Sequence, residues 1–113
     1  MNTYVIPQHL QQCIDACFAC MKACEQCFTA CLQEPDVQAR VHCISMLREC
    51  ADLCSLASQH MARNSMNAKA ICELCASVCE HCAEHCDHFE DDHCKECAEM
   101  CRKCAEACRK MVA

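Results

Sequence analysis

The sequence predicts an all-α protein: an antiparallel up-down-up-down four-helix bundle with a cysteine-lined core, formed by residues 1–113 as one domain. Three observations support this prediction. Cysteine accounts for 19 of the 113 residues. Within most of the chain the cysteines are separated alternately by three and four positions, which places them along one face of a bundled helix. The sequence has no glycine, on which hairpin turns and phosphate-binding loops depend.

Ordinary hydrophobic residues are too few to build the core. Leu, Ile, Val and Phe number 18 in a chain with a net charge of -6, and so small a share in a charged chain is typical of disorder. A neutral cysteine thiol, however, packs as a small hydrophobic group. Cysteine and alanine raise the hydrophobic fraction to 54%, so the cysteines are expected to supply the missing core.

The first predicted helix covers residues 7–32. Its cysteines, at positions 13, 17, 20, 24, 27 and 31, follow the three-and-four spacing throughout. Pro7 suits the first turn, where the N–H that proline lacks would have no helical partner. At 1.5 Å per residue, the six cysteines span about 27 Å of helix. This helix is therefore expected to present a long row of sulfur to the bundle axis.

The second predicted helix covers residues 36–63. Pro35 interrupts the chain before it, and the negative charge of Asp36 suits a first helical turn. Its three cysteines, at positions 43, 50 and 54, share one face once Leu47 is placed in the gap between the first two. The pattern therefore continues here with a leucine in place of one thiol.

The third and fourth predicted helices cover residues 67–88 and 92–111. Their cysteines lie at positions 72, 75, 79, 82 and 86 and at positions 94, 97, 101, 104 and 108. A polar segment around Asn64 is expected to separate the second and third helices, and Asp91 or Asp92 is expected to cap the fourth. Connections this short make successive helices antiparallel.

All the cysteines are candidate metal ligands rather than disulfide partners. They are Cys13, Cys17, Cys20, Cys24, Cys27, Cys31, Cys43, Cys50, Cys54, Cys72, Cys75, Cys79, Cys82, Cys86, Cys94, Cys97, Cys101, Cys104 and Cys108. The first residues have neither the basic start nor the apolar run of a secretion signal, so we expect a cytosolic protein. Thiols stay reduced in the cytosol, and an odd number of cysteines excludes complete pairing within the chain.

The charge of a thiolate core favours Cu(I) as the metal. Metals bind the thiolate form, and an uncompensated negative charge is costly in a low-dielectric interior. A monovalent ion that replaces each proton leaves the interior neutral, so many Cu(I) ions are expected per chain. Cu(I) is also an ion that soft thiolates select. The sequence therefore predicts a protein that binds many Cu(I) ions.

Two other functions remain open from the residues alone. Zn(II) sites with four thiolates apiece would each carry a charge of about -2, which disfavours zinc in a buried core without excluding bridged zinc clusters. An iron-sulfur or thiol-redox protein is the other alternative, because Cys-x-x-Cys occurs six times. The tighter three-cysteine runs of bacterial ferredoxins are absent from the sequence.

Three histidines are added to the candidate ligands. His85, His88 and His93 are expected at the bundle end that holds the first and third connections. They would form an access point where imidazole binds Cu(I) more loosely than thiolate does. The alternative is that polar residues gather at a solvated loop. Met61 and Met111 fall in register at the opposite end and are interpreted as core filler.

Several segments of the chain resemble the bacterial copper storage proteins, in particular their cytosolic branch. The likeness rests on the runs Cys13–Cys27, Arg48–Cys54, Ile71–Cys79 and His93–Cys108. The resemblance implies a four-helix bundle whose inward cysteines store many Cu(I) ions, commonly as a homotetramer and without turnover. It also implies histidines at one end of the bundle. The exported branch carries a twin-arginine signal, which this sequence lacks.

The remaining partner classes are not expected. The net charge of -6 and the scattered aromatic residues argue against nucleic acid. No stretch of sequence is long and apolar enough to span a bilayer, so no membrane partner is expected. A second apolar stripe on the first helix, which includes Ile14 and Phe18, packs within the bundle or forms a subunit interface. The copper donor and acceptor are not indicated by the sequence.

Overall fold

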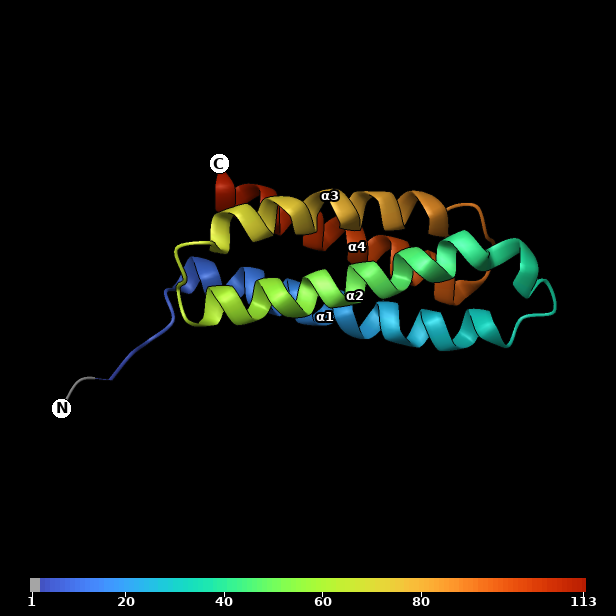
Figure 1. Cartoon of the computed structure of the whole chain (residues 1–113), viewed down its shortest axis with the longest axis horizontal. Helices are drawn as coiled ribbons and strands as arrows, with labels where there is room; N and C mark the ends of the chain where they lie inside the picture. The colour runs from blue at the N-terminus through green and yellow to red at the C-terminus, as the bar shows by residue number, and fades with distance from the viewer. Residues whose placement is uncertain (1–2) are drawn as a thin grey trace.

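The computed structural model describes residues 3–113, so Met1 and Asn2 of the expected domain lie outside the described residues. Within this range the chain forms four α-helices and one short 3₁₀ helix (Figure 1). The elements are α1 (Gln8–Leu32), η1 (Val37–Arg40), α2 (Val41–Ala62), α3 (Ala68–Cys86) and α4 (Asp92–Val112). The predicted all-α four-helix bundle is confirmed.

The helices run alternately up and down. The chain, including the extended segment that projects before α1 (Figure 1), has extents of 56 × 27 × 19 Å. Helix α1 packs against α2 and α4, and α3 packs against the same two helices. Figure 1 shows the connections α1–α2 and α3–α4 at one end of the bundle, and the start of α1 and the end of α4 at the other. We call these the loop end and the terminal end.

Two helix bounds differ from the sequence prediction at the loop end. The predicted start of the second helix, near Asp36, is instead followed by η1, and the α-helix begins at Val41. Such 3₁₀ turns are common at helix starts; here the turn ends at a buried Arg40, whose guanidinium reaches back to Asp36. The third helix ends at Cys86 and not at residue 88, because a tight turn follows in which Phe89 N–H donates to Cys86 O.

Asn64 ends the α2 segment in place of a glycine. Its φ of 50° is left-handed, a conformation that asparagine tolerates better than most residues. The Ser65 N–H then donates to His60 O at 2.9 Å, which satisfies a carbonyl of the last helical turn. The predicted polar stop between the second and third helices is therefore confirmed.

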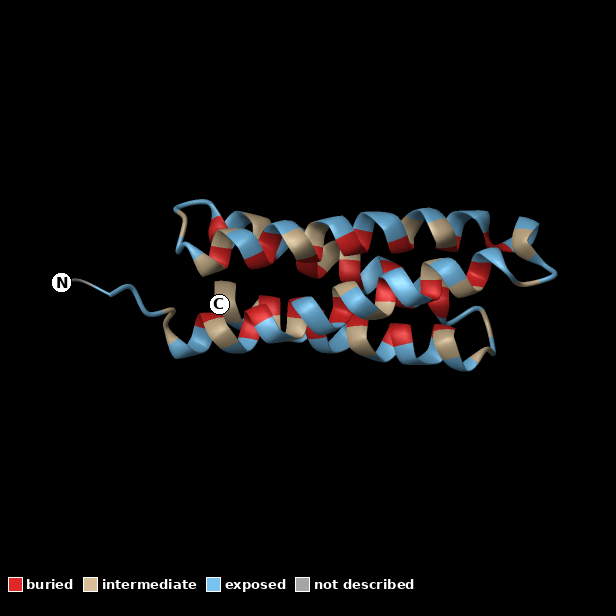
Figure 2. Ribbon diagram, turned by 90° about the horizontal axis from the view of Figure 1, so that it is seen from below, coloured by how far each residue is buried: buried red, intermediate tan, exposed pale blue. Residues whose placement is uncertain are grey.

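The core is a stripe of buried residues along the inner face of each helix (Figure 2). Cysteine and alanine make up most of it, and Leu47 and Met61 are among the largest side chains fully buried there. Leu47 occupies the register position that the cysteine spacing assigns to it. Among the described residues, no helix combines the length and the apolar character needed to cross a membrane.

Candidate metal-binding core

Every cysteine of the chain is a buried free thiol, and all of them lie within residues 3–113. None of the 19 side chains is more than 2% exposed. The three-and-four spacing explains this, because each inward position recurs on the face that a helix turns toward its neighbours. The structure therefore brings all the sequence-predicted cysteines to one place: the bundle axis.

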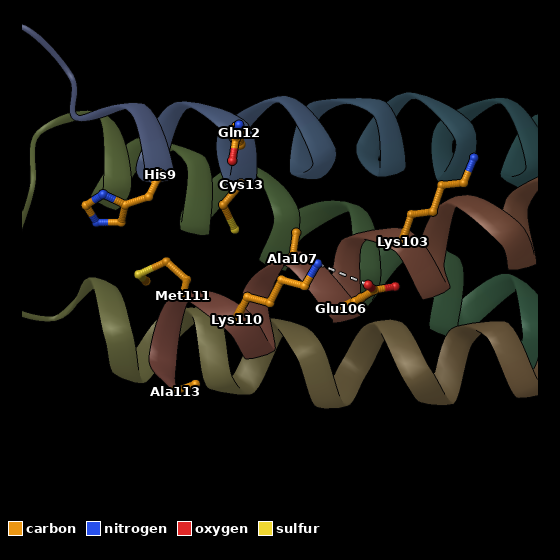
Figure 3. A pocket seen from close by; sticks show the side chains of 9 residues that line it. All are labelled: His9, Gln12, Cys13, Lys103, Glu106, Ala107, Lys110, Met111 and Ala113. Carbon is orange, nitrogen blue, oxygen red and sulfur yellow. Dashed lines mark ion pairs between the residues drawn. The ribbon is translucent and has the colours of Figure 1, made fainter.

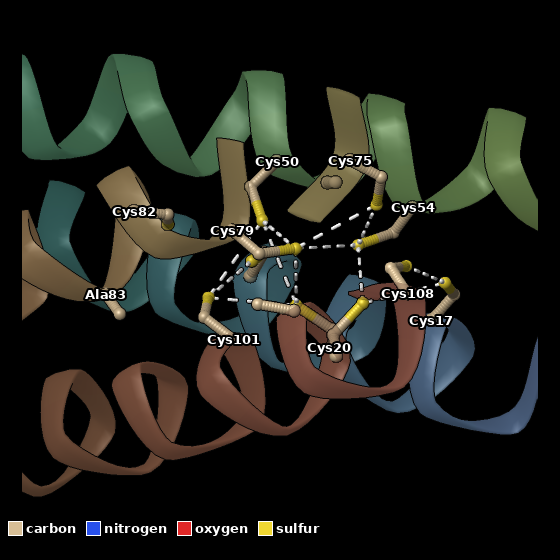
Figure 4. Packing of buried hydrophobic residues seen from close by; sticks show 14 of the residues in the cluster. Cys17, Cys20, Cys50, Cys54, Cys75, Cys79, Cys82, Ala83, Cys101 and Cys108 are labelled. Atoms are coloured by element: carbon tan, nitrogen blue, oxygen red, sulfur yellow. Dashed lines mark hydrogen bonds between the residues drawn. The ribbon is translucent and has the colours of Figure 1, made fainter. Parts of the chain in front are cut away.

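The sulfur atoms form a network that links all four helices. In Figure 4 the side chains of Cys20 (α1), Cys50 (α2) and Cys79 (α3) point toward one another. Cys50 Sγ lies 3.5 Å from Cys79 Sγ and 3.8 Å from Cys20 Sγ, and Cys20 Sγ lies 3.7 Å from Cys101 Sγ on α4. At these distances one small cation can contact sulfurs from several helices at once.

Sulfurs close enough to share one ion occur in overlapping groups of four. Cys20 and Cys50 belong both to a group with Cys24 and Cys101 and to a group with Cys54 and Cys79. All ligand atoms of a group lie within 4.8 Å of one another. In isolated tetrahedral sites, each ion needs four thiolates that it shares with no other ion. The shared members instead favour bridging thiolates and a continuous chain of ions.

The thiols cannot all ionise together in this core. Burial, together with the nearby charge of Cys31, raises the pKa of Cys94 to about 12. Hydrogen bonding with Cys101 lowers the pKa of Cys50 but raises that of Cys24. Neighbouring thiols thus shift one another's pKa in opposite directions, so ionisation of one opposes ionisation of the next. A metal cation is what allows adjacent cysteines to be thiolates at the same time.

His93 is the one predicted histidine for which the structure gives sulfur contacts. Its Nδ1 lies 3.5 Å from Cys27 Sγ, 3.6 Å from Cys94 Sγ and 4.0 Å from Cys31 Sγ. Together the four residues form a group able to hold a metal ion. On the other side of the ring, Nε2 is 3.4 Å from a Glu34 carboxylate oxygen, an arrangement that orients metal-binding imidazoles in many proteins.

His85 and His88 lie farther out at the same end. Their rings stack with centroids 6.5 Å apart. His85 is partly exposed and His88 is exposed. The loop end therefore gathers all three predicted histidines, but at different depths: His93 touches the sulfur network, and His88 reaches solvent.

Arg40 is a residue that the sequence reasoning missed. It is only 4% exposed, and its Nη1 donates to Cys31 Sγ and Cys94 Sγ, each at 3.6 Å. Its guanidinium also lies 4.4 Å above the ring of Phe89. In the sequence, Arg40 follows Asp36 by four positions, which is the pattern of an ordinary surface ion pair, so nothing marked it as buried.

The charge of Arg40 is compensated by carboxylates at the loop end. Nη2 lies 2.6 Å from Asp91 and 4.0 Å from Glu34, and Nε lies 2.7 Å from Asp36. Burial by itself lowers the pKa of Arg40, but the hydrogen bonds to Asp36 and Asp91 outweigh it and raise the pKa. The same contact lowers the pKa of Asp91. The predicted capping role of Asp91 is thus only partly met: it holds the N-cap position of α4, but its carboxylate binds Arg40.

This arrangement can bind many soft cations in a buried, sulfur-walled interior. Nineteen thiols converge on one axis, one end is lined by a histidine that contacts three of them, and the sulfur groups share members. Thiolate ligands select soft ions such as Cu(I) and also bind Zn(II). Neutral thiols pack as small apolar groups, so the same core is stable in its protonated form.

Solved proteins with a similar sequence and the same fold bind copper. The sequence profile of a family described as "Copper storage protein" (Csp) matches residues 6–113. The Cu(I)-bound copper storage protein BsCsp3 is 48% identical and superposes with a TM-score of 0.90, over 94% of this chain and all of that one. A cytosolic copper storage protein from Streptomyces lividans, with five coppers, is 33% identical with a TM-score of 0.90, over 93% of this chain and 92% of that one.

A curated relative is also similar in sequence. The uncharacterized cysteine-rich protein YhjQ of Bacillus subtilis (strain 168) is 48% identical over 69 residues, which are 61% of this chain. The matched region spans 64% of that relative's length. The profile match extends over nearly the whole bundle and includes every cysteine. This chain belongs to the copper storage protein family.

Proposed function

We propose that this protein stores Cu(I), many ions per chain, on the inward thiolates of its 19 cysteines. The observation that carries the proposal is the overlap of the sulfur groups along the axis, in which Cys20, Cys24, Cys50 and Cys101 each belong to two groups. Shared thiolates let successive ions occupy neighbouring positions without a separate ligand set for each. The solved relative BsCsp3 is Cu(I)-bound, and the one from Streptomyces lividans holds five coppers in the same fold.

The electrostatics of the core supports a monovalent cargo. Each Cu(I) that replaces a thiol proton leaves the charge of the core unchanged, so ions can be added one after another. A Zn(II) ion held by four thiolates leaves a net charge of about -2 in a medium of low dielectric constant. Nearly every side chain around the sulfurs is apolar, and the buried cation Arg40 sits at the loop end only. A repeated excess of negative charge would therefore go largely uncompensated.

The histidines of the loop end complete the proposed ligand set. We assign His93 as a ligand beside Cys27 and Cys94. His85 and His88 are proposed to meet Cu(I) before it reaches the core, because they lie nearer the solvent at the same end. Imidazole nitrogen is a less soft ligand than thiolate sulfur, so an ion bound there would pass readily to the cysteines.

The chemistry of the thiols and the relatives support a proposal for the cellular setting. The role is storage without turnover, in the cytosol, where thiols remain reduced; the Streptomyces lividans relative is a cytosolic protein. A homotetramer is proposed as the assembly. Phe18, Leu32 and Leu74 are each at least half exposed, and exposed side chains of this kind are enriched at subunit contacts. Light scattering should then give four times the 12.7 kDa of one chain.

An anaerobic Cu(I) titration of the reduced protein tests the storage function. Saturation is expected near one ion per cysteine, with about one proton released for each ion bound. Saturation at about four ions, with an equal or better capacity for Zn(II), would instead indicate isolated four-thiolate sites. Bound iron and visible colour in the purified protein would indicate an iron-sulfur function.

A further inference from the structure

The terminal end of the bundle carries a pocket that the proposed ligand set does not explain. It has a volume of about 570 Å³ and lies between the start of α1 and the end of α4. Its lining includes His9, Cys13, Lys103, Lys110 and Met111 (Figure 3). We call it the terminal pocket. Pockets of roughly 300–1,000 Å³ are typical of sites for small molecules.

The floor of the terminal pocket is part of the sulfur network. Cys13 lines the pocket, and its sulfur lies 3.7 Å from Cys108 Sγ. Cys108 Sγ is 3.8 Å from Cys17 Sγ, which in turn is 3.5 Å from Cys104 Sγ. A copper ion bound at Cys13 therefore has neighbouring sulfurs that lead into the core. At the loop end, by contrast, the guanidinium of Arg40 already occupies the space beside Cys31 and Cys94.

Two further soft donors line the same pocket. Figure 3 shows the imidazole of His9 and the thioether of Met111 beside the opening, with Cys13 deeper between α1 and α4. His9 is exposed, Met111 is partly exposed and Cys13 is buried. Thioether and imidazole are both ligands that copper accepts, and thiolate is the softest of the three. The donors thus become softer from the solvent toward the core.

The charge of the pocket differs from that of the protein as a whole. The chain carries a net charge of -6, yet the side chains of the lining include two ammonium groups, Lys103 and Lys110, and one carboxylate, Glu106. Lys110 lies 3.2 Å from Glu106, and Lys103 lies 3.1 Å from Glu99. These are exposed ion pairs within one helix, which are weak and exchange readily with other partners. An anionic ligand therefore finds two available ammonium groups at the rim.

We propose that the terminal pocket is a second copper-exchange site, which admits Cu(I) carried by a small anionic thiol. This inference rests on the proposed storage function. The carrier's carboxylates pair with Lys103 and Lys110 while its copper reaches Cys13. The sulfur–copper bond of the carrier breaks and a bond from Cys13 Sγ to copper forms. The proton of the Cys13 thiol passes to the departing thiolate of the carrier, and copper stays Cu(I) throughout. Release of stored copper is the reverse exchange.

Removal of copper by two thiols of different charge tests the proposal. Fully loaded protein is mixed anaerobically with excess glutathione, which is anionic, or with 2-mercaptoethanol, which is neutral. The variant K103E/K110E reverses the charge of the rim, and K22E/K95E makes the same change at exposed lysines that do not line the terminal pocket. The copper capacity and helical content of every variant are measured first.

We expect K103E/K110E to slow removal by glutathione about fivefold or more relative to K22E/K95E, and to leave removal by 2-mercaptoethanol within about twofold. Equal rates for the two variants with glutathione would overturn the proposal, and so would equal slowing with both thiols. Failure of the unaltered protein to bind Cu(I) would instead refute the storage function itself. A normal copper capacity in K103E/K110E, combined with unaltered removal rates, refutes copper exchange at the terminal pocket and leaves the storage function in place.

A second variant fills the opening of the terminal pocket and leaves the charge of its rim unchanged. Ala107 lines the terminal pocket and is partly exposed, so Ala107→Trp places an indole in the opening. Exchange with both thiols is expected to slow, whereas the same rates as in the unaltered protein would show that copper does not pass through this pocket. Circular dichroism of Ala107→Trp establishes that the bundle has folded.

Discussion

Arg40 and Asp91 form an ion pair of 2.6 Å that joins the first connection of the bundle to the third. The guanidinium is buried and also donates to the sulfurs of Cys31 and Cys94. The pair therefore holds two loops together and places a fixed positive charge at the end of the sulfur network. A Cu(I) ion that binds Cys31 or Cys94 at this end must compete with these hydrogen bonds.

Loss of the Asp91 carboxylate should destabilise the metal-free protein. Asp91→Asn removes the shortest ion pair of a buried guanidinium but leaves Asp36 in place. We expect the free energy of unfolding to fall by about 1–3 kcal/mol, measured by urea denaturation. Asp87→Asn is the matched control, since Asp87 pairs with Arg102 at an exposed position and should cost less than about 1 kcal/mol. Equal losses in the two variants would contradict the structural role of Arg40.

The same ion pair predicts a difference in acid stability. The guanidinium lowers the pKa of Asp91 below its ordinary value of 3.8. Stability from the pair is therefore fully present above pH 3.8 and is lost as the pH falls through the lower pKa of the folded state. The stability difference between the unaltered protein and Asp91→Asn should be constant near neutral pH and shrink in this acidic range. A difference that persists unchanged at the lowest pH would refute this explanation.

Alkaline pH should destabilise the metal-free bundle more than the copper-loaded one. Burial raises the pKa of Cys94 from 9.0 to about 12, so the folded state retains a proton that the unfolded chain has already lost. This contribution to stability is complete below pH 9 and disappears as the pH rises toward 12. In the loaded protein the thiol proton has already been replaced by Cu(I). Thermal unfolding temperatures measured at pH 7, 9 and 10.5 should therefore fall for the metal-free form and stay nearly level for the loaded form.

His93 should affect the rate of copper uptake more than the amount stored. Its Nδ1 lies within 3.6 Å of two core sulfurs, so His93→Ala removes one ligand at the loop end and leaves the cysteines in place. We expect uptake from a weak Cu(I) chelator to slow by about tenfold, with a capacity lower by at most one ion. His81→Ala is the control, because His81 is exposed. The same uptake rate in both variants would exclude a role for His93 in loading.

Loss of a cysteine whose sulfur is shared between two groups should lower the Cu(I) capacity by more than one ion. Cys101 belongs to two of the four-ligand groups and contacts sulfurs of α1 and α2. Cys101→Ser should therefore lower the Cu(I) capacity by more than one ion, whereas Cys72→Ser, near the start of α3, should lower it by about one. The capacity is read from the anaerobic titration. A loss of one ion in each variant would indicate that thiolates are not shared.

The sequence by itself determined the helices and their inner faces. Three-residue and four-residue gaps fit only one regular structure, so the burial of every cysteine and of Leu47 could be predicted without coordinates. The ligand type followed as well, because cysteines that share a helical face and stay reduced are suited to soft metals. Among soft metals the charge of a thiolate core favoured Cu(I), and the family resemblance pointed to the same ion.

Only the tertiary structure decided which sulfurs meet. Periodicity places Cys20 and Cys50 on inner faces but does not give the stagger of one helix against another, on which their 3.8 Å separation depends. The burial of Arg40 could not be predicted from the sequence either, since its partners Asp91 and Cys94 come from a distant part of the chain. The terminal pocket likewise exists because the start of α1 and the end of α4 lie side by side. Local pattern determines which face of a helix is inside, whereas contacts between helices depend on packing that no single segment encodes.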